Sequence, residues 1–142
     1  MATPEPDQNV ELVRGGLEDW IAGDHEAAMA TFTDDVEVYV PNELGNAGTY
    51  RGLEQFRSWF EGWDEAWSSF EMSIESIEAV GDRHVVAMIR SQAVGQGSGI
   101  EVENVLGWLM GVRDGRMEFL SLQPDRESAI KLARERESAG GE

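Results

Sequence analysis

The 142-residue sequence predicts an α+β fold, with a cone-shaped, curved antiparallel sheet packed on three helices of the N-terminal half and a C-terminal helix. One observation is the spacing of apolar residues in the N-terminal half, which follows the helical period except for one strand. The other is the change to alternation from Phe70 onward, where glycine-containing turns separate the segments. A curved sheet folded over a long helix encloses a cavity of the kind that binds small ligands.

Two helices separated by a tight break are predicted between residues 10 and 32, because a glycine and Asp24 interrupt the apolar pattern. Asp24 is suited to cap the second helix, since its carboxylate can accept hydrogen bonds from the free N–H groups of the first turn. Residues 36–40 then alternate as a strand that ends at Pro41. The small, polar residues that follow predict a loop up to Tyr50.

A third helix with a stripe of aromatic side chains is predicted after this loop. Its apolar residues recur at helical spacing: Leu53, Phe56, Trp59, Phe60, Trp63 and Trp67. Aromatic residues at this spacing usually pack in a core, and we assign Phe56 and Phe60 to packing. Trp59 and Trp63 are expected to line the cavity together with Trp20 of the first helix.

The remaining chain predicts a run of strands and a last helix. Strands are expected from Phe70 onward and around residues 84–94, 100–112 and 117–122. Glycines between 95 and 99, and the pair Asp114-Gly115, predict hairpin turns. Asp125 can cap the last helix, which extends through Arg136. The expected organisation is a flexible arm at residues 1–9, a single domain at 10–137 and a flexible tail at 138–142.

Composition restricts the partners that the chain can have. Eleven basic against 28 acidic residues give a net charge of −17, which repels nucleic acid and anionic membrane surfaces. The absence of cysteine and the presence of two histidines leave little to hold a metal, and we expect no metal and no cofactor. His25 is expected to be exposed, and His84, next to a turn, is expected to lie at an end of a strand without a chemical role. No apolar run is long enough for a membrane span, so a cytoplasmic location is expected.

Three short motifs occur in a fixed order along the chain. They are Gly23-Asp24-His25-Glu26-Ala27 leading to Phe32-Thr33-Asp34-Asp35-Val36, then Tyr50-Arg51-Gly52-Leu53-Glu54, then Arg113-Asp114-Gly115-Arg116-Met117. Together they resemble the SnoaL-like branch of the nuclear transport factor 2 superfamily, over roughly residues 10–135. The resemblance implies the cone fold of ketosteroid isomerases, polyketide cyclases and limonene epoxide hydrolases. Each motif also suits a turn or a helix end, so none is itself evidence for catalysis.

The resemblance allows the catalytic positions of ketosteroid isomerases to be carried over. Matching the motifs places the isomerase's oxyanion-hole tyrosine at Gly16, its general-base aspartate at Val40 and its protonated aspartate at Gly107. Proton transfer between steroid carbons needs a carboxylate base and donors at the enolate oxygen. Because the three matched positions lack these groups, we do not expect a typical ketosteroid isomerase.

The same match turns a polar face of one hairpin toward the cavity. A turn centred near Gly97-Ser98 makes the numbers of facing residues sum to about 195, which places Gln92 opposite Glu103 and Arg90 diagonal to Glu103. Two carboxylates and an arginine on one face can activate a water, one carboxylate as base and the other as acid. The candidate catalytic residues are therefore Arg90, Glu101 and Glu103, and the candidate ligand contacts are Trp20, Val40, Trp59, Trp63, Met88, Gln92 and Val105.

The opposite orientation of this hairpin stays open, and hydrophobicity alone slightly favours it. The polar residues would then form a solvated face, and the core would hold Val85, Ala87, Ile89, Ile100, Val102, Leu106 and Trp108. If the polar residues face inward instead, this apolar set forms an exposed sheet face that a second copy would bury. That orientation predicts a homodimer through the sheet.

The sequence thus predicts a small-molecule-binding protein whose aromatic-lined cavity takes an apolar ligand, with catalysis undetermined. One alternative is a metal-free cyclase or an epoxide hydrolase-like enzyme that uses the Arg/Glu cluster. Another is a protein-interaction module that uses the sheet as its interface, as the resemblance to nuclear transport factor 2 implies.

Overall fold

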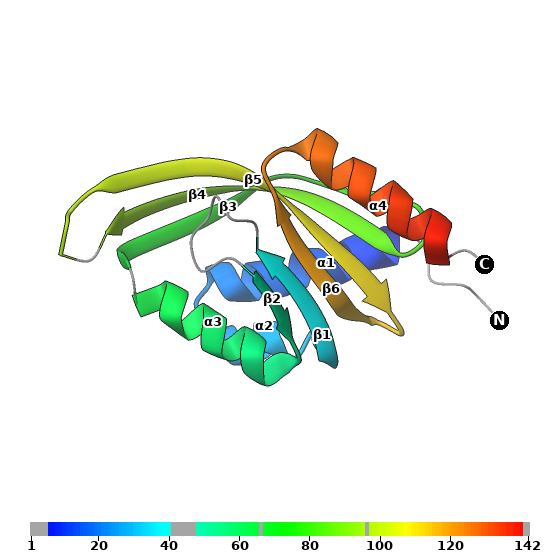
Figure 1. Cartoon of the computed structure of the whole chain (residues 1–142), viewed down its shortest axis with the longest axis horizontal. Coiled ribbons are helices and arrows are strands. Elements are labelled where there is room, and N and C mark those ends of the chain that lie inside the picture. The colour runs from blue at the N-terminus through cyan, green and yellow to red at the C-terminus, as the bar shows by residue number, and fades with distance from the viewer. Residues whose placement is uncertain (1–5, 41–47, 66, 96, 141–142) are drawn as a thin grey trace.

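The computed structural model describes residues 6–40, 48–65, 67–95 and 97–140. Its elements are α1 (Pro6–Ile21), α2 (His25–Met29), β1 (Phe32–Val40), β2 (Gly48–Arg51), α3 (Leu53–Glu65), β3 (Trp67–Val80), β4 (His84–Gly95), β5 (Glu101–Arg113), β6 (Arg116–Gln123) and α4 (Arg126–Gly140). Figure 1 shows the three N-terminal helices, the sheet and the C-terminal helix in the predicted order. The predicted α+β class is therefore confirmed.

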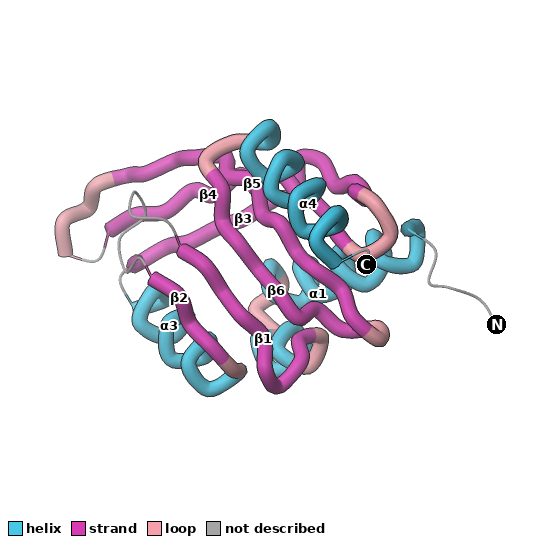
Figure 2. The backbone as a smooth tube through the Cα atoms, turned by 45° about the vertical axis from the view of Figure 1, so that its right-hand side comes forward, coloured by secondary structure: helices cyan, strands magenta, loops and turns pink. Residues whose placement is uncertain are grey.

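The sheet has six strands in the order β2-β1-β6-β5-β4-β3. Neighbouring strands are antiparallel except for β1 and β6, which run parallel. The sheet curves without closing, and β3, β4 and β5 extend past the other strands (Figures 1 and 2). In the described ranges, no helix is long and apolar enough to cross a membrane.

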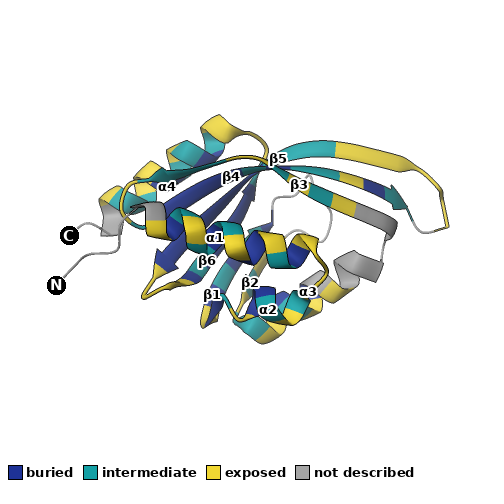
Figure 3. Ribbon diagram, turned by 180° about the vertical axis from the view of Figure 1, so that it is seen from behind, coloured by how far each residue is buried: buried dark blue, intermediate teal, exposed yellow. Residues whose placement is uncertain are grey.

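Helices cover both faces of this sheet (Figure 3). The inner face, which α1 and α3 cover, carries Val85, Ala87 and Ile89 of β4 and Trp108 and Met110 of β5 in one hydrophobic cluster. The outer face packs on α4 through a smaller cluster of Val86, Leu109, Phe119, Ala129 and Ala133. Successive strand residues point to opposite faces, so the parity of a residue number decides which helices it meets.

Turns and caps follow the predicted chemistry. Asp24 Oδ1 accepts a hydrogen bond from the Ala27 N–H at 3.2 Å, and Asp125 Oδ1 accepts one from the Ser128 N–H at 2.7 Å. The backbone of Asp114 has a φ of 52° and that of Gly115 a φ of 78°, as a tight two-residue hairpin requires. The predicted caps and this hairpin turn are confirmed.

Several boundaries differ from the expectation. The first helix begins at Pro6, and Asn9 is buried, with its side-chain amide donating to the carbonyl of Asp82 at 2.7 Å. The segment expected to be a loop before Arg51 includes the short strand β2, which pairs with β1. Trp67 does not extend the aromatic helix but opens β3, as the β-propensity of tryptophan and phenylalanine allows.

The second helix and the last helix also differ in length from the expectation. The second helix ends at Met29, before the predicted limit at residue 32, and Asp35 lies within β1. The last helix continues to Gly140.

Candidate functional site

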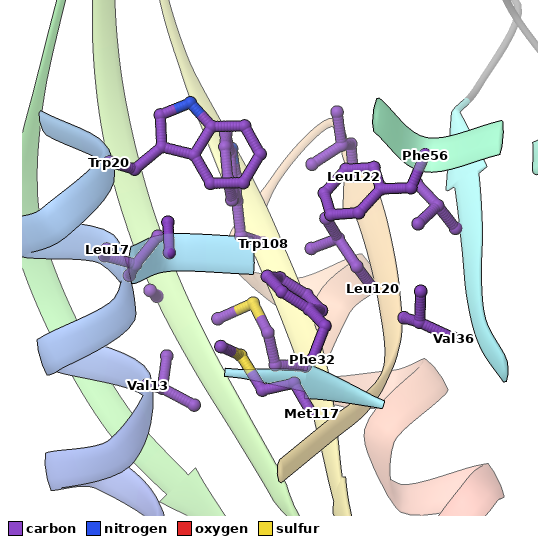
Figure 4. Close-up of a cluster of buried hydrophobic side chains, with 14 of the residues drawn as sticks. Val13, Leu17, Trp20, Phe32, Val36, Phe56, Trp108, Met117, Leu120 and Leu122 are labelled. Carbon is purple, nitrogen blue, oxygen red and sulfur yellow. The ribbon is translucent and has the colours of Figure 1, made fainter. Parts of the chain in front are cut away.

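Aromatic rings from three elements meet on the inner face of the sheet. Trp20 of α1 meets Trp108 of β5 edge to face, with ring centroids 6.4 Å apart and an interplanar angle of 88°. Phe56 of α3 lies 5.6 Å from the Trp20 ring and 6.2 Å from the ring of Trp59, on which it stacks at 20°. Figure 4 shows Trp20, Trp108 and Phe56 around Leu122. The rings form a continuous aromatic wall.

The predicted ligand contacts Trp20, Val40 and Trp59 are all buried in this inner-face cluster. Their contact with a ligand stays a prediction. The side chain of Trp63, also expected to line the cavity, lies outside the described residues.

Trp108 and Asn104 place buried polar atoms on the otherwise apolar inner face. Trp108 Nε1 and Asn104 Oδ1 have no hydrogen-bond partner within the described parts of the chain. Trp108 is 8% exposed, and strand alternation places Asn104 on the same face of β5, beyond Leu106. A buried donor or acceptor left unpaired costs about 1–3 kcal/mol, and native proteins contain few of them. Trp108 Nε1 and Asn104 Oδ1 are therefore two such exceptions among the described residues.

The predicted polar cluster forms between β3, β4 and β5. Gln92 faces Glu103, and Val94 faces Glu101, so the predicted register of the hairpin is confirmed. The Gln92 amide donates to Glu103 Oε2 at 2.6 Å, and Arg90 Nη1 lies 3.3 Å from the same oxygen. Glu75 of β3, which the sequence analysis did not single out, accepts from Arg90 Nε at 2.6 Å.

This cluster lies on the outer face, and the predicted inward orientation was wrong. Met88, of the same parity as Arg90 and Gln92, packs against the α4 side, whereas Ile89 is fully buried under α1. Gln92, Glu101 and Glu103 line a surface hollow of about 300 Å³. The physical reason is that the polar groups of Arg90, Gln92 and Glu103 stay in contact with water on this face, whereas the alternating residues Val85, Ala87 and Ile89 of β4 are apolar and buried.

The outer-face position applies to six of the predicted site residues. They are Met88, Arg90, Gln92, Glu101, Glu103 and Val105. The sheet separates these residues from Trp20, Val40 and Trp59, so the predicted set cannot line one cavity. The apolar residues Ile89, Leu106 and Trp108, expected to point outward in that orientation, pack in the monomer core.

Comparison with known protein families identifies the family of this chain. The model of the SnoaL-like domain matches residues 13–118. The chain belongs to the SnoaL-like domain family. No curated protein sequence matches it.

Solved structures share the fold of this SnoaL-like domain at low sequence identity. Bal32a from a soil-derived mobile gene cassette is 20% identical, with a TM-score of 0.75, covering 82% of this chain and 88% of its own. A Jannaschia sp. CCS1 protein assigned as a SnoaL-like polyketide cyclase is 20% identical, with a TM-score of 0.74 and coverage of 92% and 94%. TerC, co-crystallized with polyporic acid, is 17% identical, with a TM-score of 0.73 and coverage of 89% and 98%.

The surroundings of Gly107 show why matching this residue to the isomerase aspartate predicted the wrong orientation of β5. A Cβ at Gly107 would lie 2.8 Å from the carbonyl oxygen of Asp125 and 3.1 Å from Cβ of Ala129. The glycine therefore faces the start of α4, on the outer face, and lets the helix approach the sheet. The neighbours Leu106 and Trp108 belong to the inner-face cluster, so position 107, matched to the isomerase aspartate, does not face the predicted cavity.

The electrostatics of the outer cluster are poorly suited to proton transfer. The hydrogen bond to Glu75 raises the pKa of Arg90 above its ordinary value, and the hydrogen bonds from Gln92 and Arg90 lower the pKa of Glu103. A general acid or base works best with a pKa near the operating pH. Because both shifts lead away from neutrality, the network favours fixed charges that join three strands.

A second polar cluster fixes α4 to the sheet. His84 is 3% exposed, and its Nδ1 lies 2.5 Å from Glu137 Oε2. Glu137 also accepts from the backbone N–H of Arg83 at 2.8 Å, and the Arg136 guanidinium lies 3.5 Å from the ring centroid of Phe119. His84 does open a strand, as predicted, yet sequence spacing gave no sign of its partner on the last helix.

The local sequence carries little sign of the polar atoms of Trp108 and Asn104 on the inner face. Trp108 was assigned to the outward set in one orientation and to the core in the other, never as a donor. Asn104 was not singled out, although it is a polar residue within the apolar alternation of Val102, Leu106 and Trp108. In the part of the chain that the structure describes, no cluster of three or more acidic residues or histidines could hold a metal ion.

Proposed function

We propose that this SnoaL-like domain binds an apolar, ring-containing small molecule at the inner face of its sheet. The observation that carries the proposal is the aromatic wall, in which α1, α3 and β5 each contribute rings. Aromatic side chains supply large apolar contact area and prefer edge-to-face or offset contact with other rings. Binding sites for small ligands combine such walls with a small number of polar groups.

The known structures support the same ligand class. TerC was co-crystallized with polyporic acid, and the Jannaschia protein is assigned as a polyketide cyclase. Both share the fold of this chain over more than four-fifths of its length. A cyclic polyketide or a related aromatic metabolite is therefore the first ligand class to test.

Binding can be tested by tryptophan fluorescence and calorimetry. Polyporic acid and a panel of steroids, terpenoids and aromatic polyketides would be titrated into the wild-type protein, Trp59→Phe on the inner face and Arg90→Ala on the outer face. We expect saturable quenching by at least one ring compound, weaker in Trp59→Phe and unchanged in Arg90→Ala. No saturable binding by any compound, or binding lost equally in both variants, would contradict the proposal.

The alternative of a metal-free cyclase or epoxide hydrolase-like enzyme that uses Arg90, Glu101 and Glu103 has weaker support. These residues lie across the sheet from the aromatic wall, and the charges of Arg90 and Glu103 are fixed by their partners. Turnover of an epoxide or polyketide that is abolished in Glu103→Gln would favour this alternative.

The predicted homodimer needs a different surface from the one first expected, because the apolar sheet face is core. Among the described residues, Ile100 and Val102 near the β4–β5 turn are exposed, Ile100 to 64%. Sedimentation at micromolar concentration, for the wild type and Ile100→Glu, tests association through this end. A monomer at two salt concentrations would contradict the dimer. The dimer and a cytoplasmic location both stay predictions.

A further inference from the structure

We infer that Trp108 Nε1 and Asn104 Oδ1 are the two hydrogen-bonding points for the ligand, which therefore belongs to the elongated aromatic compounds with an acceptor oxygen at one end and a hydroxyl at the other. The inference rests on the proposed function, since it assigns polar contacts within the same inner face. Both atoms are buried, and both lack a partner among the described residues.

The chemistry of the two atoms sets the chemistry of the ligand. An indole Nε1–H can only donate, so it selects a carbonyl or another acceptor oxygen. An amide oxygen can only accept, so it selects a hydroxyl or another donor. Trp108 therefore needs an acceptor on the ligand, and Asn104 Oδ1 needs a donor. A ligand with two carbonyls and no hydroxyl would pair with Trp108 Nε1 but not with Asn104 Oδ1.

The strand sets the distance between the two groups. Asn104 and Trp108 are four residues apart on β5, and the extended backbone rises about 3.3 Å per residue, so their Cα atoms are separated by roughly 13 Å. This length corresponds to two or three rings in a row. Leu106 lies between them on the same face, which makes the middle of the site apolar.

The surroundings of Trp108 supply no competing group from the sheet. Its neighbours across the strands are Ala87 on β4 and Leu122 on β6, both apolar and both in the inner-face cluster. The Trp20 ring meets the Trp108 ring edge to face on the α1 side. A ligand oxygen would therefore be the strongest acceptor that the indole N–H meets there.

The experiment uses four biphenyl probes that differ in their end groups. They are biphenyl, 4-acetylbiphenyl, 4-hydroxybiphenyl and 4-acetyl-4′-hydroxybiphenyl. Calorimetry would give the Kd of each for the full chain. One hydrogen bond of ordinary strength corresponds to roughly a five- to tenfold change in Kd. We expect the acetyl group and the hydroxyl group each to tighten binding by that factor.

Two variants assign each preference to its residue. Trp108→Phe keeps a ring but removes the N–H, and should abolish the preference for the acetyl probes while retaining that for the hydroxyl probes. Asn104→Leu should do the reverse. Arg90→Ala on the outer face is the control, because it lies outside the proposed site and should leave both preferences intact. Circular dichroism would verify the fold of each variant.

A spectroscopic measurement on the wild type avoids dependence on the folding of the variants. The indole N–H resonance of Trp108 should move further downfield on addition of 4-acetylbiphenyl than of biphenyl, because a hydrogen bond to the acetyl oxygen adds to the ring-current shift that both probes cause. Equal Kd values for all four probes would overturn the inference while leaving the proposed function intact, as would an acetyl preference that survives in Trp108→Phe. If no biphenyl probe binds while a compound of the wider panel does, the inference is overturned and the proposed function stands.

Discussion

Arg136 Nε donates a hydrogen bond to His84 Nε2 at 3.1 Å, which requires a neutral imidazole with its proton on Nδ1. That proton faces Glu137. His84 of β4 is therefore hydrogen-bonded to two residues of α4, Arg136 through Nε2 and Glu137 through Nδ1. The Arg83 side chain also contacts Glu137, donating to its backbone carbonyl at 3.2 Å. Protonation of His84 at Nε2 would place its N–H against the N–H of Arg136 Nε, so that two donors face each other.

Stability should therefore fall on acidification through His84. Burial lowers the pKa of His84, although the hydrogen bond with Glu137 acts in the opposite direction. The unfolded chain then binds a proton more readily than the folded one, near an unfolded pKa of about 6.5. The stabilising contribution is complete above that pH and is lost as the pH falls toward the folded pKa. The free energy of unfolding in urea, measured between pH 8 and 5.5, should decrease.

The His84→Gln variant isolates this contribution. Its unfolding free energy should be lower at pH 8 and should depend less on pH in that range. Glu137, whose pKa is lowered by hydrogen bonds that outweigh burial, adds a loss in the same direction at lower pH. His25→Gln is the control, and an equally flattened profile in that variant would contradict the assignment to His84.

Replacement of Ile89 tests which face of the hairpin is core. Ile89 is fully buried, so Ile89→Ala should reduce the free energy of unfolding by about 2–5 kcal/mol. Ile100→Ala removes the same atoms from an exposed side chain and should change it by less than about 0.5 kcal/mol. Chemical denaturation measures both, and similar losses would contradict the assignment of faces.

Gly107 should tolerate no side chain. Gly107→Ala places Cβ against the Asp125 carbonyl and should destabilise the fold by about 1–3 kcal/mol, through displacement of α4. Gly15→Ala is the matched substitution, because its Cβ meets nothing within 4 Å in helix α1. It should stabilise the protein by about 0.5–1 kcal/mol, since alanine favours the helix. Thermal unfolding of the two variants should shift in opposite directions.

The outer polar cluster should have a small effect on stability and on binding. The Arg90 side chain is 40% exposed, and surface ion pairs contribute about 0–1 kcal/mol. Arg90→Ala should therefore change the unfolding free energy by less than about 1 kcal/mol and leave the Kd of a bound ring compound unchanged. A tenfold loss of affinity in calorimetry would show that the two faces of the sheet are coupled.

The register of the hairpin was predictable, because a short glycine turn fixes which residues face each other. The facing of Gln92 and Glu103 follows from that turn alone. Which face of the hairpin packs in the core was not predictable in the same way. The register fixes which residues are opposite each other, but it does not determine which face of the hairpin is buried. The apolar alternation around Ile89 favoured the correct face, and the match of Gly107 to an isomerase aspartate favoured the wrong one.

Contacts between elements that are far apart in the sequence could not be predicted from it. The glycine at position 107 serves α4, a helix that begins almost twenty residues later, and no local pattern indicates that approach. The pairing of His84 with Glu137 and the unpaired atoms of Asn104 and Trp108 depend on the same tertiary packing. Turns, caps and helix periods are local, and these were predicted best.

The parallel pairing of β1 with β6 has a consequence for how the chain folds. Val38 lies beside Leu120, although the two belong to opposite ends of the sequence, whereas β3 to β6 are joined by short turns. Closing a long loop costs more entropy than closing a hairpin, so we expect the four-strand meander to form first and β1 to dock late. During synthesis from the N-terminus, β1 must then wait without its central partner until β6 has left the ribosome.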